Sequence, residues 1–266
     1  MRRKNKKSEL PDISVIIPSF NKVKYIGETL TSLIAQDYPH LEVIIQDPGS
    51  TDGSLKIIGS YVKKYPGIFK LYKEKDGGQL DAINKGFEKA NGDVLAYINA
   101  DDTYELGALR KVGGYFLGHP DSLWLAGRGK VINKKGDEVA KAIAIYKNIL
   151  LKINSYKLLL VTNYLIQPSV FLTRKAWSKY GPFQGKTKFV MEYEMWLRMG
   201  KKCMPAIIDD NLSSFRMSGE NISAVQYEQT LSEDENIVLR HTKNKLVLGL
   251  HRLNNLGRLC VVKFLQ

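Results

Sequence analysis

Two adjacent carboxylates, Asp101 and Asp102, closely follow the apolar run "VLAY", where a buried strand should end. Burying either acid is costly unless a positive charge compensates it. Carboxylate oxygens are preferred ligands of Mg²⁺ and Mn²⁺, which also accept substrate phosphates as ligands. Asp is equally a favoured N-cap, and a helix is expected to begin near Glu105. The pair therefore predicts a site for Mg²⁺ or Mn²⁺, with helix capping by Asp102 as the alternative.

Polar or aromatic side chains also follow the three other predicted strands, at 13–18, 41–46 and 68–73. Together with the strand at 94–99 that precedes the acid pair, this makes four such strand ends. The residues concerned are Ser19, Phe20, Asn21, Asp47, Gln79, Asp81, Asn84, Asn99 and Asp101. Some residues of the run "DPGSTDGS" are also expected to form a turn and cap the helix that follows. Because ligands bind beyond the carboxyl ends of parallel strands, we expect one binding site at this edge.

Helices must separate these strands for their ends to meet, and the apolar spacing supports this. Apolar residues recur at helical intervals over 23–36, from Leu55 to Val62 and from Ile83 to Ala90. The third helix is followed by Asn91-Gly92, a normal helix stop. Strands that alternate with helices predict an α/β fold with a parallel sheet and right-handed crossovers.

As an ordered set, these motifs resemble family 2 glycosyltransferases, which have the nucleotide-sugar-binding A-type fold. The amino half is carried by "SVIIPSFN", "EVIIQDPGSTDGS" and "DGGQLDAINKGFEKANGDVLAYINADD", and the acceptor half by "QPSVFLTRKAWSKYGPF", "VMEYEMWLR" and "FR". The resemblance implies a Rossmann-like, mostly parallel sheet flanked by helices. It divides the chain into a basic tail (1–11), a glycosyltransferase domain (12–225, with a nucleotide-binding half at 12–103 and an acceptor half at 104–225) and a basic C-terminal helical extension (226–266).

The resemblance also implies a function. The protein is expected to be a metal-dependent, inverting glycosyltransferase. It would move a sugar from a nucleoside-diphosphate sugar to a hydroxyl of a glycan or lipid-linked acceptor, in surface polysaccharide or glycolipid synthesis. The strand-end residues would bind the donor, with a UDP-sugar favoured, and Asp101 and Asp102 would hold the metal on its pyrophosphate. The catalytic base falls on Glu192 in "MEYEMWLR", with Glu194 as the second candidate.

The segment 190–200 has a structural interpretation as well. Met191, Met195 and Met199 recur at helical spacing and should pack inward. Trp196 is expected in the core rather than under a sugar ring. Both interpretations hold together, because Glu192 lies on another face of the same helix.

Three positions depart from the family pattern. Pro48 stands where relatives often carry a second acid, and Asn99 stands in the first place of the Asp-x-Asp metal motif, where an amide brings no charge. Met217 and Ser218 follow the "FR" pair where a His is frequent, so no His is predicted as a ligand. The first two departures keep a catalytically impaired nucleotide-sugar-binding relative as an alternative.

The formal net charge of +13 is concentrated at the two ends. Residues 1–10 carry five Lys or Arg and one Glu, and residues 236–266 carry six Lys or Arg and no acid. Basic tails on a nearly neutral body favour an anionic membrane surface, or merely aid solubility. The body lacks interleaved basic and aromatic residues, so a nucleic-acid-binding protein is the less favoured alternative and no nucleic-acid partner is expected.

The tail at 245–266 is predicted to be an amphipathic helix. Its apolar stripe is Leu246, Leu250, Leu253, Gly257, Cys260 and Phe264. The basic residues fall largely off this stripe, which is typical of an interfacial helix lying on anionic lipid. The alternative is that the stripe docks on the enzyme body or on a second subunit, as in a homodimer.

No apolar stretch is long enough to span a membrane, and the start "MRRKNKKSEL" lacks the apolar core of a signal peptide. Cys203 and Cys260 match no metal or redox spacing. We therefore expect a cytoplasmic protein, peripheral on the inner face of the plasma membrane if its tail binds lipid.

A nucleotidyltransferase that makes sugar nucleotides is a disfavoured alternative. That class typically has a glycine-rich phosphate loop after its first strand, whereas the loop "PSFNKVKY" has no glycine.

Overall fold

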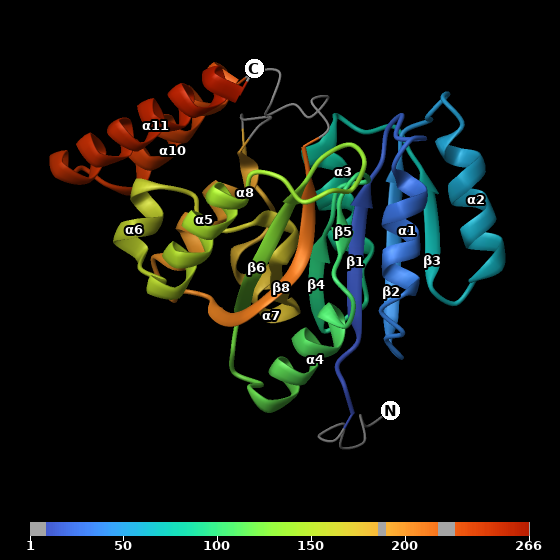
Figure 1. Cartoon of the computed structure of the whole chain (residues 1–266). Helices are drawn as coiled ribbons and strands as arrows, with labels where there is room; N and C mark the ends of the chain where they lie inside the picture. The colour runs from blue at the N-terminus through green and yellow to red at the C-terminus, as the bar shows by residue number, and fades with distance from the viewer. Residues whose placement is uncertain (1–8, 186–189, 218–226, 266) are drawn as a thin grey trace.

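The described residues build one sheet of 8 strands (Figure 1). The computed structural model describes residues 9–185, 190–217 and 227–265. The strand order is β3-β2-β1-β4-β7-β6-β8-β5. The strands are β1 (Ile13–Pro18), β2 (Leu41–Asp47), β3 (Phe69–Lys73), β4 (Val94–Tyr97), β5 (Thr103–Tyr104), β6 (Trp124–Ile132), β7 (Val170–Thr173) and β8 (Ala206–Arg216).

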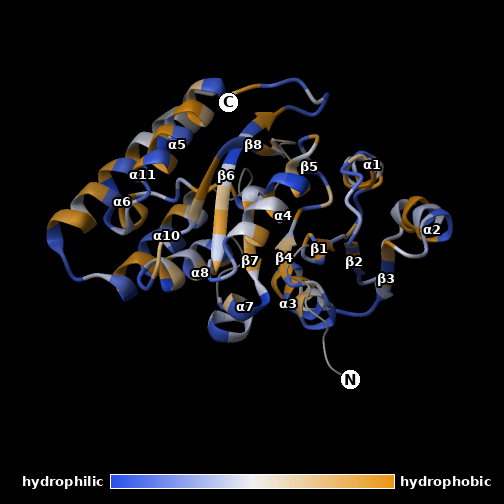
Figure 2. Cartoon of the chain, turned by 90° about the horizontal axis from the view of Figure 1, so that it is seen from below, coloured by the Kyte–Doolittle hydropathy of each residue, from blue (hydrophilic) through white to orange (hydrophobic). Residues whose placement is uncertain are grey.

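Helices cover both faces of this sheet (Figure 2). On one face lie α1 (Ile26–Ile34), α2 (Ser54–Lys64) and α4 (Ala108–Gly118). On the other lie α3 (Gln79–Lys89), α5 (Lys141–Ile153), α6 (Tyr156–Val161), α7 (Arg174–Tyr180) and α8 (Met191–Gly200). The short 3-10 helix Gln167–Ser169 leads into β7, and α10 (Tyr227–His241) and α11 (Lys245–Leu265) end the chain.

The core consists of two hydrophobic clusters, one on each face of the sheet, and β1 contributes side chains to both. Val15 and Ile17 pack with α1 and α2, whereas Ile16 packs with α3. A strand buried on both faces reads as a continuous apolar run, as "ISVIIP" does. Gly86 of α3 lies so close to β1 that an added Cβ would stand 2.4 Å from the Ile16 side chain. Glycine there lets the helix press against the strand.

The predicted alternation of strands and helices is confirmed for the first half of the chain. β1 is parallel to β2 and β4, and β2 is parallel to β3. The second half is less regular, because β7 enters beside β4 and runs antiparallel to both β4 and β6. The sheet is therefore mostly parallel rather than wholly so.

The predicted C-terminal helical extension is also confirmed, as α10 and α11. Helix α11 packs against α6 and α10. Throughout the described ranges, each helix is too short or too polar to cross a bilayer. Most of the predicted basic N-terminal tail, residues 1–8, lies outside the described residues.

Candidate functional site

The carboxyl ends of β1 and β2 are joined by side-chain hydrogen bonds. Ser19 Oγ donates to Asp47 Oδ2 at 3.1 Å, and the backbone N of Asn21 donates to Ser50 Oγ at 2.8 Å. Asn21 adopts a left-handed φ of 52°, which Asn tolerates better than most residues. Its Oδ1 accepts from the backbone N of Thr51 at 3.0 Å. The structure thus brings together Ser19, Asn21 and Asp47, as predicted.

Asp47 is fully buried and is held by its own loop. Its Oδ1 accepts from the backbone N of Gly49 and of Ser50, at 2.9 and 2.7 Å. Its Oδ2 accepts from the hydroxyls of Ser19 and Ser50. A carboxylate with these donors fixes the shape of the loop. Contact of Asp47 with the nucleotide-sugar donor stays a prediction, and it requires one of these hydrogen-bond donors to give way.

Asp102 is also fully buried, and it ties the loop after β4 to the end of β8. Its Oδ1 accepts from the backbone N of Arg216 at 2.7 Å, and its Oδ2 from Asn99 Nδ2 at 3.1 Å. Burial, followed by the charge of Asp101, raises the pKa of Asp102 well above its usual value. The alternative that Asp102 caps the next helix is wrong, since α4 begins at Ala108 and its N-cap is Gly107.

Arg216 is a buried arginine whose importance was not predicted, although the "FR" pair had been noted. Only 1% of it is exposed. Its Nε donates to the carbonyl of Asp101 at 2.8 Å, its guanidinium lies 5.0 Å from the centre of the Tyr25 ring, and one of its amino groups pairs with Glu28. An arginine that directly follows the uncharged run "NLSSF" of β8 is the signal that could have revealed it.

Asp101 forms an ion pair with Lys22, whose Nζ lies 2.8 Å from Oδ2. Among the described residues, no group of three or more His, Cys, Asp or Glu could hold a metal on its own. Mg²⁺ is often bound through only one or two carboxylates, with substrate phosphates and water completing its shell. The oxygens of Asp101 suit this mode of binding, whereas both oxygens of Asp102 already accept protein hydrogen bonds.

Three amide side chains lie at the carboxyl end of β4, and one of them, Asn99, contacts Asp102. Gln79 Nε2 donates to Asn99 Oδ1 at 2.7 Å, so two of the predicted donor-binding residues contact each other. Gln167, the first residue of the 3-10 helix before β7, donates to the carbonyl of Tyr97 at 2.8 Å. Its Oε1 is buried and lacks a hydrogen-bond partner within the described part of the chain. This glutamine belongs to the "QPS" run but was not predicted as a site residue.

The three remaining predicted donor-binding residues are less closely engaged. Phe20 is 58% exposed. Asp81 pairs with Lys85 at 2.8 Å, and this bond lowers the pKa of Asp81. The side-chain amide of Asn84 donates to the backbone carbonyl of Phe183 and accepts from its backbone N, each at 3.0 Å, and so ties α3 to the acceptor half. Their contact with a donor stays a prediction.

Glu192 is the second residue of α8 and is partly buried. Burial raises its pKa to about 7; the charge of Asp234 adds to the rise and that of Lys147 opposes it. The charge of Glu192 in turn helps raise the pKa of buried Tyr97, the last residue of β4. Glu192 therefore acts electrostatically on the last residue of β4, the strand whose following loop carries Asp101 and Asp102. A carboxyl group with a pKa near 7 is suited to accept and release a proton.

Glu194, the second candidate base, is engaged differently. Both of its oxygens accept from Arg198 one turn later, at 3.2 and 2.9 Å. Arg198 also donates to the carbonyl of Pro182 at 3.1 Å. This pair fixes α8 against the loop before it, which is a structural role.

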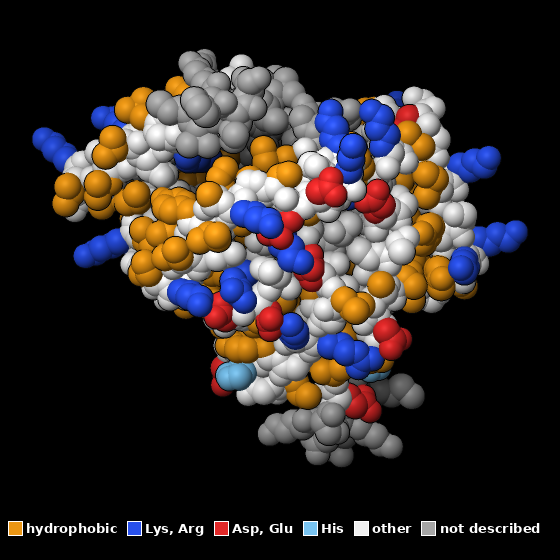
Figure 3. All heavy atoms as spheres, viewed as in Figure 1, with side chains coloured by type: hydrophobic (Ala, Val, Ile, Leu, Met, Phe, Trp, Pro, Cys, Tyr) orange, Lys and Arg blue, Asp and Glu red, His pale blue; other side chains and the backbone are white. Residues whose placement is uncertain are grey.

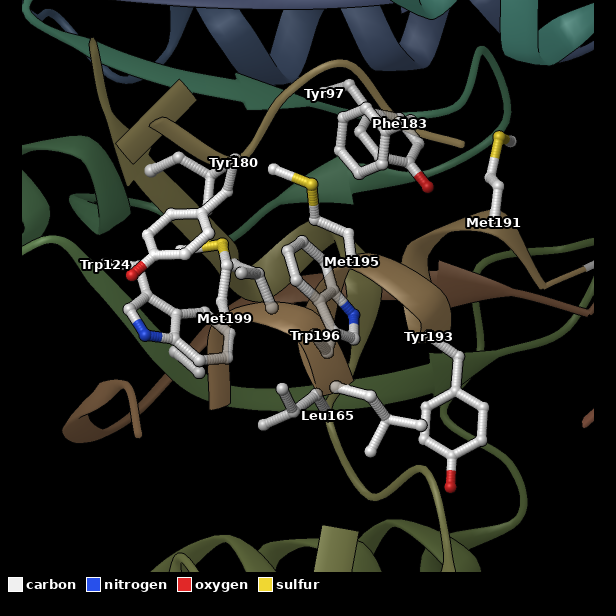
Figure 4. Packing of buried hydrophobic residues seen from close by; sticks show 14 of the residues in the cluster. Tyr97, Trp124, Leu165, Tyr180, Phe183, Met191, Tyr193, Met195, Trp196 and Met199 are labelled. Carbon is white, nitrogen blue, oxygen red and sulfur yellow. The ribbon is translucent and has the colours of Figure 1, made fainter. Parts of the chain in front are cut away.

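The inward face of α8 matches the prediction (Figure 4). Met191, Met195 and Met199 are buried, and Trp196 is 2% exposed. The Trp196 ring stacks on Trp124 with centroids 5.6 Å apart. Trp196 is thus a core residue rather than a sugar platform, and this packing fixes the helix that presents Glu192.

The chain has recognisable relatives among curated proteins. The glycosyltransferase TuaG of Bacillus subtilis (strain 168), named for teichuronic acid biosynthesis, is 40% identical over 101 residues, or 38% of this chain and 40% of TuaG. A dolichyl N-acetyl-alpha-D-glucosaminyl phosphate 3-beta-D-2,3-diacetamido-2,3-dideoxy-beta-D-glucuronosyltransferase of Methanococcus voltae is 35% identical over 136 residues, or 50% of this chain and 42% of that protein. The matches thus span less than half of each relative.

Solved structures share the fold, and a family model matches the sequence. Mannosyltransferase PcManGT from Pyrobaculum calidifontis, solved with GDP-Man and Mn²⁺, has a TM-score of 0.73 at 19% identity and covers 97% of this chain and 74% of its own. S. aureus TarS 1-349, solved with UDP-GlcNAc, has a TM-score of 0.61 at 17% identity and covers 89% and 69%. The model described as Glycosyl transferase family 2 matches residues 14–181, more than half of the chain. The chain therefore belongs to glycosyl transferase family 2.

Proposed function

We propose that this protein is an inverting glycosyltransferase that moves a sugar from a nucleoside-diphosphate sugar to a hydroxyl of a glycan or lipid-linked acceptor. The observation that carries the proposal is Glu192, a carboxyl group with a pKa of about 7 that acts on Tyr97, the last residue of β4 and four residues before Asp101. Residues 12–103 hold the donor in this proposal, and residues 104–225 hold the acceptor.

In the proposed reaction Glu192 accepts the proton of the acceptor hydroxyl. The freed oxygen attacks the anomeric carbon of the sugar, and the bond from that carbon to the diphosphate oxygen breaks. The nucleoside diphosphate leaves with the bonding electron pair. Because attack and departure occur on opposite faces of the sugar, the configuration of the anomeric carbon inverts. General base catalysis of this kind contributes about 10²- to 10⁴-fold to a rate.

The strand-end loops would bind and orient the donor. Asp101 would hold Mg²⁺ or Mn²⁺, with Asp102 as the second predicted ligand. When bound, such an ion supplies positive charge to the leaving diphosphate. Asn99 and Gln79 fix each other beside it, and Lys22 is a further cation within reach of phosphate oxygens. Lys22 was not among the predicted donor-binding residues.

The relatives support the substrate classes. PcManGT was solved with GDP-Man and Mn²⁺, and TarS with UDP and with UDP-GlcNAc. TuaG is named for teichuronic acid biosynthesis, and the Methanococcus voltae enzyme is named for a dolichyl-linked sugar phosphate. We favour a UDP-sugar as donor and a surface polysaccharide or glycolipid as product.

The proposal is tested by measuring thermal stabilisation with a panel of UDP-, GDP- and dTDP-sugars, with and without Mn²⁺. A ligand that binds only the folded state at 100 times its Kd adds about 2.7 kcal/mol of stability. We expect one donor to stabilise the chain with Mn²⁺ and to be consumed when a glycan or lipid-linked acceptor is added. Donor binding without any transfer would favour the impaired relative that Asn99 suggests. Stabilisation by none of the donors would contradict the proposal.

A further inference from the structure

Helix α5 exposes a continuous apolar face. Ile145, Ile149 and Ile153 recur every four residues, with exposed fractions of 58%, 55% and 61%. Ile143 and Tyr146 extend the same face. Large apolar side chains gathered in this way mark an interaction site rather than chance exposure.

Helix α11 exposes a second apolar face. Leu246, Leu250 and Leu253 of the predicted stripe are 72%, 45% and 65% exposed, and Leu256 joins them. The helix docks through its opposite side, where His251 is buried. The described part of the stripe therefore does not pack on the enzyme body, which was one of the alternatives. The side chains of its last two predicted members, Cys260 and Phe264, lie outside the described residues.

The two apolar faces belong to neighbouring helices. Helix α6 follows α5 after two residues and packs against α11. The space-filling view shows hydrophobic side chains gathered over this part of the molecule, with Lys and Arg around them (Figure 3). We call this surface the α5/α11 face and define it by the exposed apolar residues Ile143, Ile145, Tyr146, Ile149, Ile153, Leu246, Leu250, Leu253 and Leu256.

Basic side chains are in excess around the α5/α11 face, although Lys152 of α5 pairs with Asp209 and Arg252 of α11 pairs with Glu235. Residues 139–191 and 236–266 contain no Asp or Glu at all. Lys141, Lys157, Lys243 and Lys245 are exposed around the face, and within the described ranges none of the four forms an ion pair. A surface with apolar centre and basic rim matches the chemistry of an anionic bilayer, whose headgroups are negative and whose interior is apolar.

We propose that the α5/α11 face is a membrane-binding surface that inserts its apolar side chains into an anionic lipid leaflet. A second copy of this chain fits less well, because it would bring Lys141, Lys157, Lys243 and Lys245, which form no ion pair within the described ranges, against their own counterparts. A nucleic acid would use the lysines but leave the isoleucines and leucines exposed. The membrane accounts for both features.

The inner side of α5 gives the surface a consequence for catalysis, which rests on the proposed function. Lys147 points inward from α5, and burial lowers its pKa to about 8, with the charge of Glu192 acting against this shift. The base and the lipid-facing isoleucines therefore lie on opposite sides of one helix. A lipid-linked acceptor held in the leaflet would then be separated from the Lys147 side of α5 by about one helix diameter, roughly 10 Å.

The test is flotation of the full chain with vesicles, without donor or metal. Neutral phosphatidylcholine vesicles are compared with vesicles that also contain phosphatidylglycerol. Ile149→Glu changes α5 and Leu253→Glu changes α11, each at an exposed position that should not disturb the fold. Leu106→Glu, at a residue 79% exposed before α4, is the matched control.

We expect binding only to the anionic vesicles, weakened by salt. Each of Ile149→Glu and Leu253→Glu should lower partitioning on the order of tenfold or more, and Leu106→Glu should leave it unchanged. Removing one rim charge, with Lys141→Gln, should lower it about fivefold, whereas Lys56→Gln on α2 should not.

Three results would overturn the proposal. These are wild-type binding by Ile149→Glu, equal binding to neutral vesicles, or no flotation together with a dimer in solution that both variants dissociate. The last result would assign the face to a second copy of the chain. Because the assay contains no donor, its failure leaves the proposed transfer reaction unaffected, and a lack of transfer would not alter flotation.

Discussion

The acids at the sheet edge and the acid on α8 are held in opposite ways. Asp47 and Asp102 accept hydrogen bonds from their surroundings on both oxygens, and Asp101 is paired with Lys22. Glu192 has no ion pair among the described residues, and burial raises its pKa to about 7. The difference separates acids that shape a binding site from one that is free to exchange a proton. Substituting each of these groups in turn tests this distinction.

The largest effect is expected from Glu192→Gln, which keeps the shape of the side chain but cannot accept a proton. Transfer should fall by about 10²- to 10⁴-fold while donor binding persists. The melting temperature above pH 7 should rise, because a carboxylate that burial disfavours has been removed. Glu194→Gln is the control, and it should weaken the Arg198 pair with little loss of kcat. A collapse of kcat in Glu194→Gln alone would move the base to that residue.

The second-largest effect is expected from Arg216→Met. It leaves the carbonyl of Asp101 and its other acceptors unpaired, and breaking a buried charged contact usually costs about 3–5 kcal/mol of unfolding free energy. Arg128→Met is matched to it, since Arg128 pairs with exposed Asp209 and should cost less than about 1 kcal/mol. Urea unfolding of both variants measures the difference. Equal losses would show that Arg216 is no more than an ordinary ion-pair residue.

Asp101→Asn should lower transfer by about 10²- to 10³-fold, the usual loss when one group that stabilises transition-state charge is removed. Mn²⁺-dependent stabilisation by the donor should disappear, and the fold should remain, since the change alters charge rather than packing. Circular dichroism and the donor panel report the two quantities. Full activity of this variant, or of the wild type in excess EDTA, would exclude the metal site.

The smallest effect is the pH dependence. Because the raised pKa of Glu192 keeps it protonated below about pH 7, kcat should fall about tenfold per pH unit as the pH drops further. Folding stability should change in the opposite sense: the protonated form is favoured in the folded chain, so stability declines as the pH rises from the unfolded value of 4.5 towards 7. A profile in Glu192→Gln that keeps the same slope would assign the titration to another group.

The sequence predicted the first four strands and three helices because their apolar periods are local and regular. It also placed the inward methionines and Trp196 correctly, since one helix face is defined within about ten residues. The antiparallel entry of β7 was not predictable, because strand pairing depends on partners distant in the chain. The hydrogen bonds of the site were not predictable for the same reason. Asp102 and Arg216 are 114 residues apart, and no local sequence pattern indicates the hydrogen bond between them.

The hydrogen bonds of Arg216 bear on the modularity of this protein. The loop that carries Asp101 and Asp102 belongs to the nucleotide-binding half by sequence, yet its last supports come from the end of β8. An isolated fragment 12–103 would lack them. Chimeras that graft this half onto the acceptor half of a relative should keep Arg216 with the donor loop, because the unit that can be exchanged is discontinuous along the chain.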